Sequence, residues 1–457
     1  MSENLVRGGA GALGRQLARS GVTALAIHVG GAGLTYCAQL VIARSIGAHG
    51  FGVYAYVLAW ATLLAYCAAL GFDVSMLRFV AAYRAQGSWG LLRGVIRYGE
   101  HRALASGICI AFAGSLLATI WAAGQPELAR TFMAGLLLVP VLALLWIRAA
   151  IVRALGGVAS ALAPNSIVRD GTLLVLLGLA SLVPGCRLSA PVVMGGTVVT
   201  AALALGLVSL AVRRRMPRAA AAAVPAYEAS TWLRVVLPFV ALGFADVAMN
   251  RAGVVLLGWT GRTTDAGIYA LAFNIAFMAT LPRAAINALF APTISDRFVR
   301  SGRDALQPLA TQSALYTLLG ALGVAIPAAV FAGPVLTWFG HDFAAGVPAL
   351  RILLLGQVVA AGAGSQLYLL TMTGHERGAA LLALAMVVAN VAAGACFIHL
   401  FGLLGAAIAT TATLIVWNAA MAVLIWRRLR LLPGAIAALR AMPGTRAWAA
   451  GERGAVS

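Results

Sequence analysis

The chain has 457 residues, of which 62% are hydrophobic and only 10% are charged, and its formal net charge is +20. A mean hydropathy of +0.93 excludes an ordinary water-soluble globular protein. The positive charge does not require a nucleic-acid partner, because arginines hold the cytoplasmic loops of membrane proteins on the inner side. The composition therefore predicts an all-α polytopic membrane protein.

Apolar stretches of about twenty residues recur along the whole chain, and each is long enough to cross a bilayer as a helix. We expect about twelve transmembrane helices, of which the stretch at 164–184 is the weakest. The first six expected spans are about 20–43, 51–72, 103–123, 132–154, 164–184 and 190–212. The other six are about 234–258, 266–290, 309–331, 351–373, 378–400 and 403–426.

Arginines concentrate in every second gap between these spans, which predicts that both termini are cytoplasmic in a bacterial inner membrane. Arg169, at the start of the fifth span, is counted among the cytoplasmic arginines, and Asp170 beside it predicts a local ion pair. The apolar run after Arg19 is too long for a signal peptide and lacks a small-residue cleavage site. It is therefore expected to remain as the first span.

The chain is expected to fold as two halves. We assign residues 1–212 to an N-terminal lobe, 213–233 to a cytoplasmic linker, 234–430 to a C-terminal lobe and 431–457 to a cytoplasmic tail. A weak repeat supports this division. Phe51-Gly52-Val53-Tyr54-Ala55 matches Ala266-Gly267-Ile268-Tyr269-Ala270, and Arg78-Phe79-Val80 matches Arg297-Phe298-Val299. An even number of spans per half makes this a parallel repeat, with a pseudo-two-fold axis along the membrane normal.

Several motifs fall in the first repeat and near the last span. They are Ala43-Arg44, Gly50-Phe51-Gly52-Val53-Tyr54, Leu70-Gly71-Phe72-Asp73, Arg78-Phe79-Val80 and the segment from Phe401 to Thr410. Together they resemble the bacterial polysaccharide flippases of the MOP superfamily, which also contains the multidrug and toxin (MATE) extruders. The resemblance implies two six-helix lobes facing a central cavity. It also implies alternating access and transport of an oligosaccharide on undecaprenyl diphosphate for cell-surface polysaccharide synthesis.

For such a protein we expect no cofactor, and coupling to the membrane potential, protons or sodium is left open. The expected partners are the lipid-linked oligosaccharide, membrane lipids and polysaccharide assembly proteins, with the transporter itself a monomer. The four cysteines within spans and the single outer-loop Cys186 have no paired or metal-binding spacing, so neither a disulfide nor a metal site is expected.

Cationic side chains within spans are costly in a membrane and therefore indicate function, here binding of the diphosphate. Arg251 and Arg283 are the candidates. Asp246 and Asn250 share a helical face beside Arg251, and Asn287 follows Arg283 by one turn, after a kink expected at Pro282. In the alternative, Arg251 pairs with an acid between packed helices and Arg283 reaches the inner interface.

The first span carries a second set of polar residues, His28, Thr35 and Gln39, on one face. They are expected either to line a polar cavity or to form hydrogen bonds between helices. The neighbouring Gly30, Gly31 and Gly33 predict a close approach of helices. Where the second span meets the cytoplasm, Asp73 is a candidate for gating or proton coupling with Arg78, or a plain interfacial acid.

Two other functions are alternatives for a membrane protein of this kind. A MATE-like cation or drug extruder should carry acidic and aromatic residues in its cavity, whereas Arg251 and Arg283 suit an anionic substrate. A membrane glycan polymerase or glycosyltransferase would need catalytic acids in a sizeable outer loop. The longest outer gap, around Trp338 to Asp342, has about twenty residues, so we expect a transporter rather than an enzyme.

Overall fold

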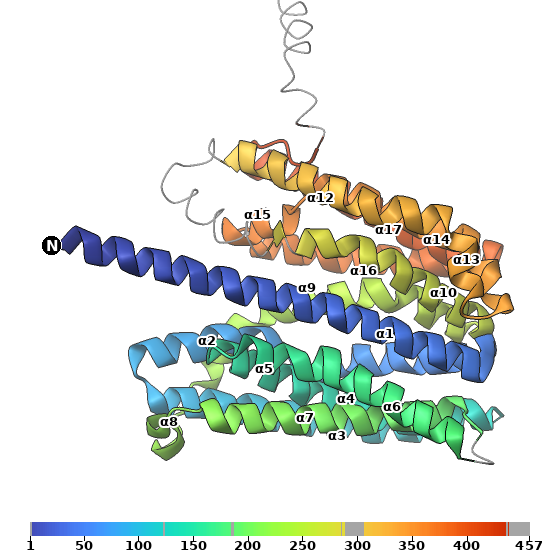
Figure 1. Cartoon of the computed structure of the whole chain (residues 1–457), viewed down its shortest axis with the longest axis horizontal. Helices are drawn as coiled ribbons and strands as arrows, with labels where there is room; N and C mark the ends of the chain where they lie inside the picture. Colours follow the sequence, from blue (N-terminus) through green and yellow to red (C-terminus); the bar gives the residue numbers. More distant parts are fainter. Residues whose placement is uncertain are drawn as a thin grey trace, which may run out of the picture. The chain divides into compact units, whose positions relative to one another are not determined.

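The structure is a computed structural model that describes residues 2–121, 124–183, 187–284, 286–287, 306–435 and 437. These residues form helices joined by turns, with no β-strand among them (Figure 1). They divide into two compact units, Met1–Val247 and Ala248–Ser457. The predicted all-α architecture is confirmed.

The first unit is built from long helices with short connections. They are α1 (Ser2–Ala69), α2 (Phe72–Gln86), α3 (Trp89–Trp121), α4 (Pro126–Ala154), α5 (Val158–Ala163), the π-helix η1 (Pro164–Val168), α6 (Arg169–Leu182), α7 (Ala190–Arg215) and α8 (Arg218–Ala222). Helix α9 (Ala229–Trp259) begins in this unit and ends in the second.

The described part of the second unit continues from α9. Its elements are α10 (Thr263–Phe277), the 3₁₀ turn η2 (Met278–Thr280), α12 (Leu306–Val330), α13 (Ala332–Thr337), the 3₁₀ helix η3 (His341–Gly346), α14 (Val347–Ala363), α15 (Gln366–Met372), α16 (Glu376–Phe401) and α17 (Leu403–Leu429). The predicted outer segment around Trp338 is thus occupied by two short helices, α13 and η3.

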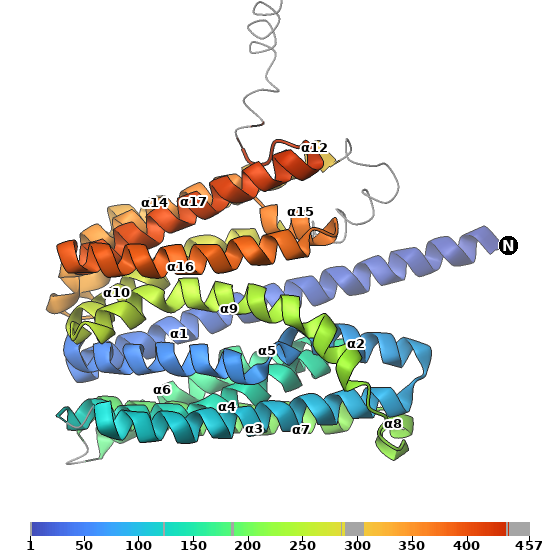
Figure 2. The ribbon, with the colours of Figure 1, turned by 180° about the vertical axis from the view of Figure 1, so that it is seen from behind.

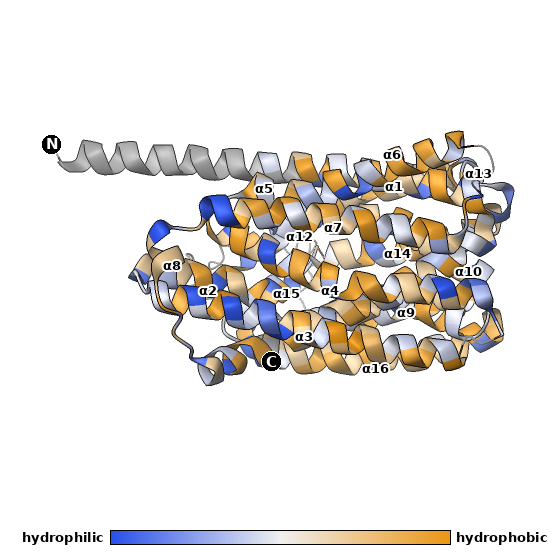
Figure 3. Cartoon of the chain, turned by 90° about the horizontal axis from the view of Figure 1, so that it is seen from below, coloured by the Kyte–Doolittle hydropathy of each residue, from blue (hydrophilic) through white to orange (hydrophobic). Residues whose placement is uncertain are grey.

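Eleven stretches of the described chain are long and apolar enough to cross a membrane. The first, Ala26–Gln86, contains α2 and the part of α1 that begins at Ala26, and α1 is broken at Gly47 (φ 70°, ψ 179°). Only glycine adopts this backbone conformation readily, so Gly47 allows the chain to turn between two crossings. With that stretch counted as two crossings, the structure agrees with the expected twelve. Figure 3 shows apolar residues along the lengths of α3, α4 and α16.

The helical segment that contains Pro282, where a kink was expected, changes from α-helix to a 3₁₀ turn about one turn before that residue. Helix α10 ends at Phe277 and gives way to the 3₁₀ turn Met278–Thr280. A proline has no amide hydrogen, so Pro282 cannot donate to the carbonyl group of Met278, and its ring crowds that carbonyl. The backbone therefore adopts the tighter 3₁₀ conformation at Met278–Thr280, the turn that precedes the proline.

The division between the units lies within α9, not in the predicted linker at 213–233. Trp232 is fully buried in the first unit, where its indole N–H donates to the Tyr83 hydroxyl at 2.9 Å. Its ring centroid lies 5.5 Å from that of Tyr98 on α3. The first turns of α9 thus fold with the first unit, and Figure 2 shows α9 following from α8. Hydropathy alone does not reveal this aromatic packing.

The two units contain the same hydrogen bond at matching positions of the predicted repeat. In the first unit the Tyr54 hydroxyl lies 3.3 Å from that of Thr197 on α7. In the second the Tyr269 hydroxyl lies 2.8 Å from that of Thr410 on α17. Each bond joins the second crossing of its unit to the last, which supports the repeat. The other matched motif, Arg297-Phe298-Val299, lies outside the described residues.

We expect Tyr54→Phe and Tyr269→Phe to destabilise the protein by similar amounts, because each removes one buried bond between helices and leaves the ring in place. The expected loss is about 0.5–1.5 kcal/mol for each. Chemical denaturation of the two variants in detergent micelles measures it. An effect confined to one unit would show that the two bonds are not equivalent.

Candidate functional site

A cluster of hydrogen-bonded polar side chains lies midway along the fifth crossing of the first unit. The candidate span runs from Val158 to Leu182, so Arg169 and Asp170 lie near its centre. The sequence predicted that this span begins at 164, with Arg169 at its cytoplasmic start; the candidate span in the structure begins earlier, at Val158. The hydropathy of the helix's first half is lowered by Pro164, Asn165, Arg169 and Asp170. A prediction from hydropathy therefore places the start of the helix after its actual start.

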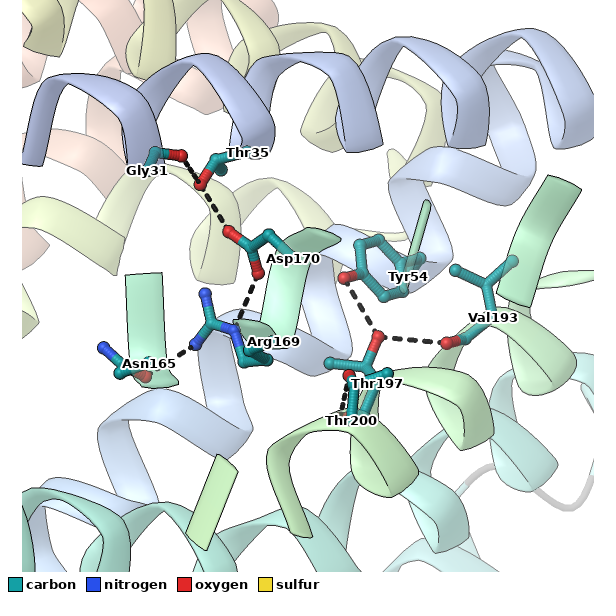
Figure 4. A network of polar contacts seen from close by, with 9 residues as sticks. All are labelled: Gly31, Thr35, Tyr54, Asn165, Arg169, Asp170, Val193, Thr197 and Thr200. Atoms are coloured by element: carbon teal, nitrogen blue, oxygen red, sulfur yellow. Dashed lines mark hydrogen bonds and ion pairs between the residues drawn. The ribbon is translucent and has the colours of Figure 1, made fainter. Parts of the chain in front are cut away.

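Arg169 and Asp170 form the ion pair that the sequence predicted. The Nε atom of Arg169 donates to Oδ1 of Asp170 at 2.7 Å, and Nη1 donates to the Asn165 side-chain oxygen at 3.3 Å. On the other side, the Thr35 hydroxyl of α1 donates to Oδ2 of Asp170 (Figure 4). We call Thr35, Asn165, Arg169 and Asp170 the Arg169 cluster.

Two backbone features bring the Arg169 cluster together. The turn Pro164–Val168 is a π-helix, in which the amide of Arg169 bonds to the carbonyl of Pro164. Such turns rotate the residues that follow and are frequent at functional sites. In addition, a Cβ atom on Gly31 would lie 2.7 Å from Cβ of Ser166, so glycine lets α1 approach the π-helix closely. The predicted close approach is confirmed for Gly31, whereas Gly30 and Gly33 have no atom within 4 Å of such a Cβ.

The hydrogen-bonding groups of the Arg169 cluster are not all occupied. The Asp170 side chain is only 7% exposed, but that of Arg169 is 27% exposed. In the described part of the chain, the Nη2 amine of Arg169 has no protein acceptor. The Thr35 hydroxyl lies between Asp170 and the Gly31 carbonyl, 2.9 Å away, and its single proton can serve only one of them. The cluster can therefore accept one more polar group at Arg169.

The other polar residues predicted in the first unit are dispersed. His28 is exposed on α1, and Gln39 is partly buried with its Oε1 atom shielded and without a hydrogen-bond partner. Of the three predicted on one face, Thr35 forms a bond between helices. Arg78 is exposed on α2, whereas Asp73 interacts electrostatically with Arg153 of α4, not with the predicted Arg78. Nothing in the sequence near Asp73 indicates Arg153, which is distant along the chain.

Asp246 and Asn250 lie one turn apart on α9, as predicted from their spacing, and Arg251 directly follows Asn250. Asp246 is exposed and belongs to the first unit, whereas Asn250 and Arg251 are partly buried and belong to the second. Their role in substrate binding stays a prediction.

Arg283 and Asn287 follow the 3₁₀ turn of the second unit, and both are partly buried. The Asn287 side-chain oxygen accepts a hydrogen bond from Ser365, whose hydroxyl also lies 2.9 Å from that of Ser313 on α12. Ser365 occupies the break between α14 and α15, after Gly364 (φ 76°). Asn287 is therefore hydrogen-bonded to the break between α14 and α15, a contact that the spacing of residues alone did not predict.

Comparison with known proteins gives a consistent picture. A profile of the family described as "Polysaccharide biosynthesis protein" matches residues 17–298. The comparison with curated protein sequences finds no match.

Among solved structures, the chain is similar to a multidrug resistance MATE family transporter of the MOP superfamily in its inward-facing conformation. The TM-score is 0.69 at 15% identity, over 90% of this chain and 98% of that one. Similarity to the outward-facing conformation of such a transporter has a TM-score of 0.58 at 15% identity, over 91% and 95%. A MATE protein in complex with MaL6 gives 0.62 at 15% identity, over 91% and 96%.

Proposed function

The chain belongs to the polysaccharide biosynthesis protein family, and we propose that it moves a lipid-linked oligosaccharide across the membrane by alternating access. The substrate is an oligosaccharide on undecaprenyl diphosphate, which passes from the inner to the outer leaflet of the bacterial cytoplasmic membrane. Sugar hydroxyl groups cannot enter hydrocarbon without losing their hydrogen bonds, at a few kcal/mol each. A protein with a polar interior must therefore carry them.

The observation that supports this proposal is that Arg169 lies near the middle of Val158–Leu182, a helical stretch long and apolar enough to cross a membrane. An arginine at this depth costs roughly 2.5–3.5 kcal/mol on insertion scales, so it is retained mainly for function. Its planar guanidinium group matches phosphate oxygens in a two-pronged geometry. The partly exposed side chain and its unoccupied Nη2 amine favour an anionic ligand over a cationic drug. Arg251 and Arg283 are proposed as diphosphate-binding residues of the second unit.

We expect the membrane potential to drive the outward step. The diphosphate carries close to two negative charges, and the bacterial interior is electrically negative. Outward movement gains about 2.3 kcal/mol per charge at 100 mV, hence roughly 4–5 kcal/mol in total. Collapsing an imposed potential in proteoliposomes should slow outward transport strongly. Rates that do not respond to the potential would contradict this energy source.

The function is tested by deleting the gene in its host and identifying the lipid-linked glycan that accumulates on the inner leaflet. The proposal predicts that an undecaprenyl diphosphate oligosaccharide accumulates and that wild-type protein clears it. Drug sensitivity without glycan accumulation would instead indicate a MATE-like extruder. The Arg169→Gln variant should fail to clear the glycan, whereas Arg130→Gln, at an exposed position near the start of α4, should clear it normally.

A further inference from the structure

One membrane-crossing stretch of the second unit, His341–Thr371, is interrupted before its end. Helix α14 ends at Ala363, and α15 begins at Gln366. Between them Gly364 has a backbone conformation (φ 76°, ψ −154°) that only glycine adopts readily. Such a break leaves the last carbonyl groups of α14 without the amides that a continuous helix would supply. Within a membrane these carbonyl groups must find donors elsewhere in the protein.

The carbonyl group of Gly362, in the last turn of α14, takes its donor from the segment that follows α17. In a continuous helix this carbonyl would accept from the amide of Gln366, four residues later. Here it accepts from the amide of Ala435, at 2.8 Å. Gly434 (φ 99°) allows this approach, because a Cβ atom there would lie only 3.1 Å from the same carbonyl oxygen. A distant segment therefore replaces the amide of the helix itself.

A sharp turn at the end of α17 directs this segment back onto the unit. The helix ends at Leu429, and Arg430 (φ 56°) has a left-handed conformation that is strained for a residue with a side chain. Leu429 and Leu431 are buried on the two sides of the turn. The Arg430 guanidinium group lies over the Trp426 ring, 5.4 Å from its centroid. We call residues 430–435 the strap, and Figures 1 and 2 both show it in red beside the start of α12.

The Gln307 side chain, in the first turn of α12, holds the strap by two hydrogen bonds to one residue. Its Nε2 atom donates to the carbonyl of Leu432 at 2.8 Å, and its Oε1 atom accepts from the amide of Leu432 at 2.9 Å. The Leu432 side chain is 40% exposed, so apolar packing contributes little at this point. The attachment of the middle of the strap therefore depends on the amide group of Gln307.

The break that the strap covers also positions Asn287. Ser365 directly follows the break, and its hydroxyl donates to the Asn287 side-chain oxygen and lies 2.9 Å from that of Ser313. Ser365 has backbone angles of φ −88° and ψ 46°, which are not helical. If Gln366 bonded to the Gly362 carbonyl, α14 and α15 would become one helix and Ser365 would take helical angles. Its side chain would then point in a different direction, and Asn287 would lose this donor.

From these contacts we propose that Gln307 is a positioning residue, which holds the strap over the break and thereby keeps α14 and α15 apart. While the strap is bound, the amide of Ala435 occupies the Gly362 carbonyl. When the strap leaves, the amide of Gln366 takes its place and the two helices join. The second unit thus has two arrangements, selected by the donor to one carbonyl group. The inference goes beyond the proposed function, since it does not depend on which substrate the transporter carries.

The test is hydrogen–deuterium exchange of the purified full chain in nanodiscs, without substrate, for wild type and Gln307→Ala. The amides of the strap should exchange at least about fivefold faster in the variant, because two of its hydrogen bonds are lost. The amides of residues 365–368 should exchange more slowly, because they gain helical acceptors when α14 and α15 join. A merely structural role of Gln307 would instead make both segments exchange faster.

Matched variants separate the strap from the glutamine side chain. Ala435→Pro removes the amide hydrogen that Gly362 accepts and should also slow exchange at residues 365–368, whereas Ala435→Ser keeps that hydrogen and should behave as wild type. Gln86→Ala, at an exposed glutamine that ends α2, should change neither segment. Faster exchange in both segments, or an unchanged rate at residues 365–368 once the strap is released, overturns the proposal. Should Gln307→Ala fail to fold, the two Ala435 variants still decide.

Discussion

Asp170→Asn should stop transport of the lipid-linked oligosaccharide and destabilise the first unit. The substitution removes the negative partner of Arg169 and leaves its positive charge at the centre of a crossing helix. Breaking a buried pair from one side typically costs about 3–5 kcal/mol, because the remaining charge is uncompensated. Thermal unfolding of the purified variant measures the loss of stability, and proteoliposomes measure the loss of transport.

The double variant Arg169→Gln/Asp170→Asn distinguishes a structural pair from a functional one. Two neutral amide side chains can still hydrogen-bond to Asn165 and Thr35, so most of the lost stability should return. Transport should not return, because the first unit no longer has the Arg169 guanidinium group to bind the diphosphate. If the double variant transports normally, the Arg169 cluster serves only to hold α1 and α6 together.

Gly405→Ala should be the most damaging small substitution in the second unit. Gly405 lies in the first turn of α17, and a Cβ atom there would overlap the carbonyl oxygen of Phe397 on α16. The two helices are joined directly by Gly402 (φ 56°), so they cannot separate without disturbing that turn. Overpacking costs about 1–3 kcal/mol, and the rigid backbone of Phe397 places this case near 3 kcal/mol.

The matched control is Gly323→Ala, in α12 of the same unit, where a Cβ atom would meet nothing within 4 Å. Alanine favours the helix over glycine by up to about 1 kcal/mol, so this variant should be neutral or slightly more stable. Unfolding of the two variants in the same detergent measures the difference. Equal stability of Gly405→Ala and Gly323→Ala would mean that α16 and α17 are less closely packed than the structure shows.

Much of the fold could be predicted because it depends on local signals. The lengths of the apolar runs predicted the membrane crossings, and Pro282 predicted the change of helix type at the end of α10. The match of Tyr54 with Tyr269 predicted the repeat. Each of these follows from hydrophobicity or backbone chemistry that a few neighbouring residues determine. Helix boundaries were harder to predict where polar residues occur, because a buried cluster of charged residues within a helix has the same composition as a loop.

The candidate site was predicted only in part, because its contacts join residues that are distant along the chain. Neighbouring positions suggested the ion pair of Arg169 with Asp170, but nothing local connects them to Thr35 of α1. Likewise, the sequence suggested Arg78 as the partner of Asp73, and packing against α4 supplies Arg153 instead. A charged pair within a long apolar run, preceded by Pro164 and Asn165, was the signal that could have placed Arg169 in the membrane.

We propose that the first unit holds an arginine within the membrane to receive an anionic lipid-linked substrate. The most direct measurement is the flipping rate of a fluorescent undecaprenyl diphosphate oligosaccharide in proteoliposomes containing wild-type protein, Arg169→Gln or Arg130→Gln. We expect rapid flipping by wild type and Arg130→Gln, with a loss of at least about tenfold in Arg169→Gln, as expected for a charged contact of about 1.4 kcal/mol or more. Equal rates for all three proteins would contradict it.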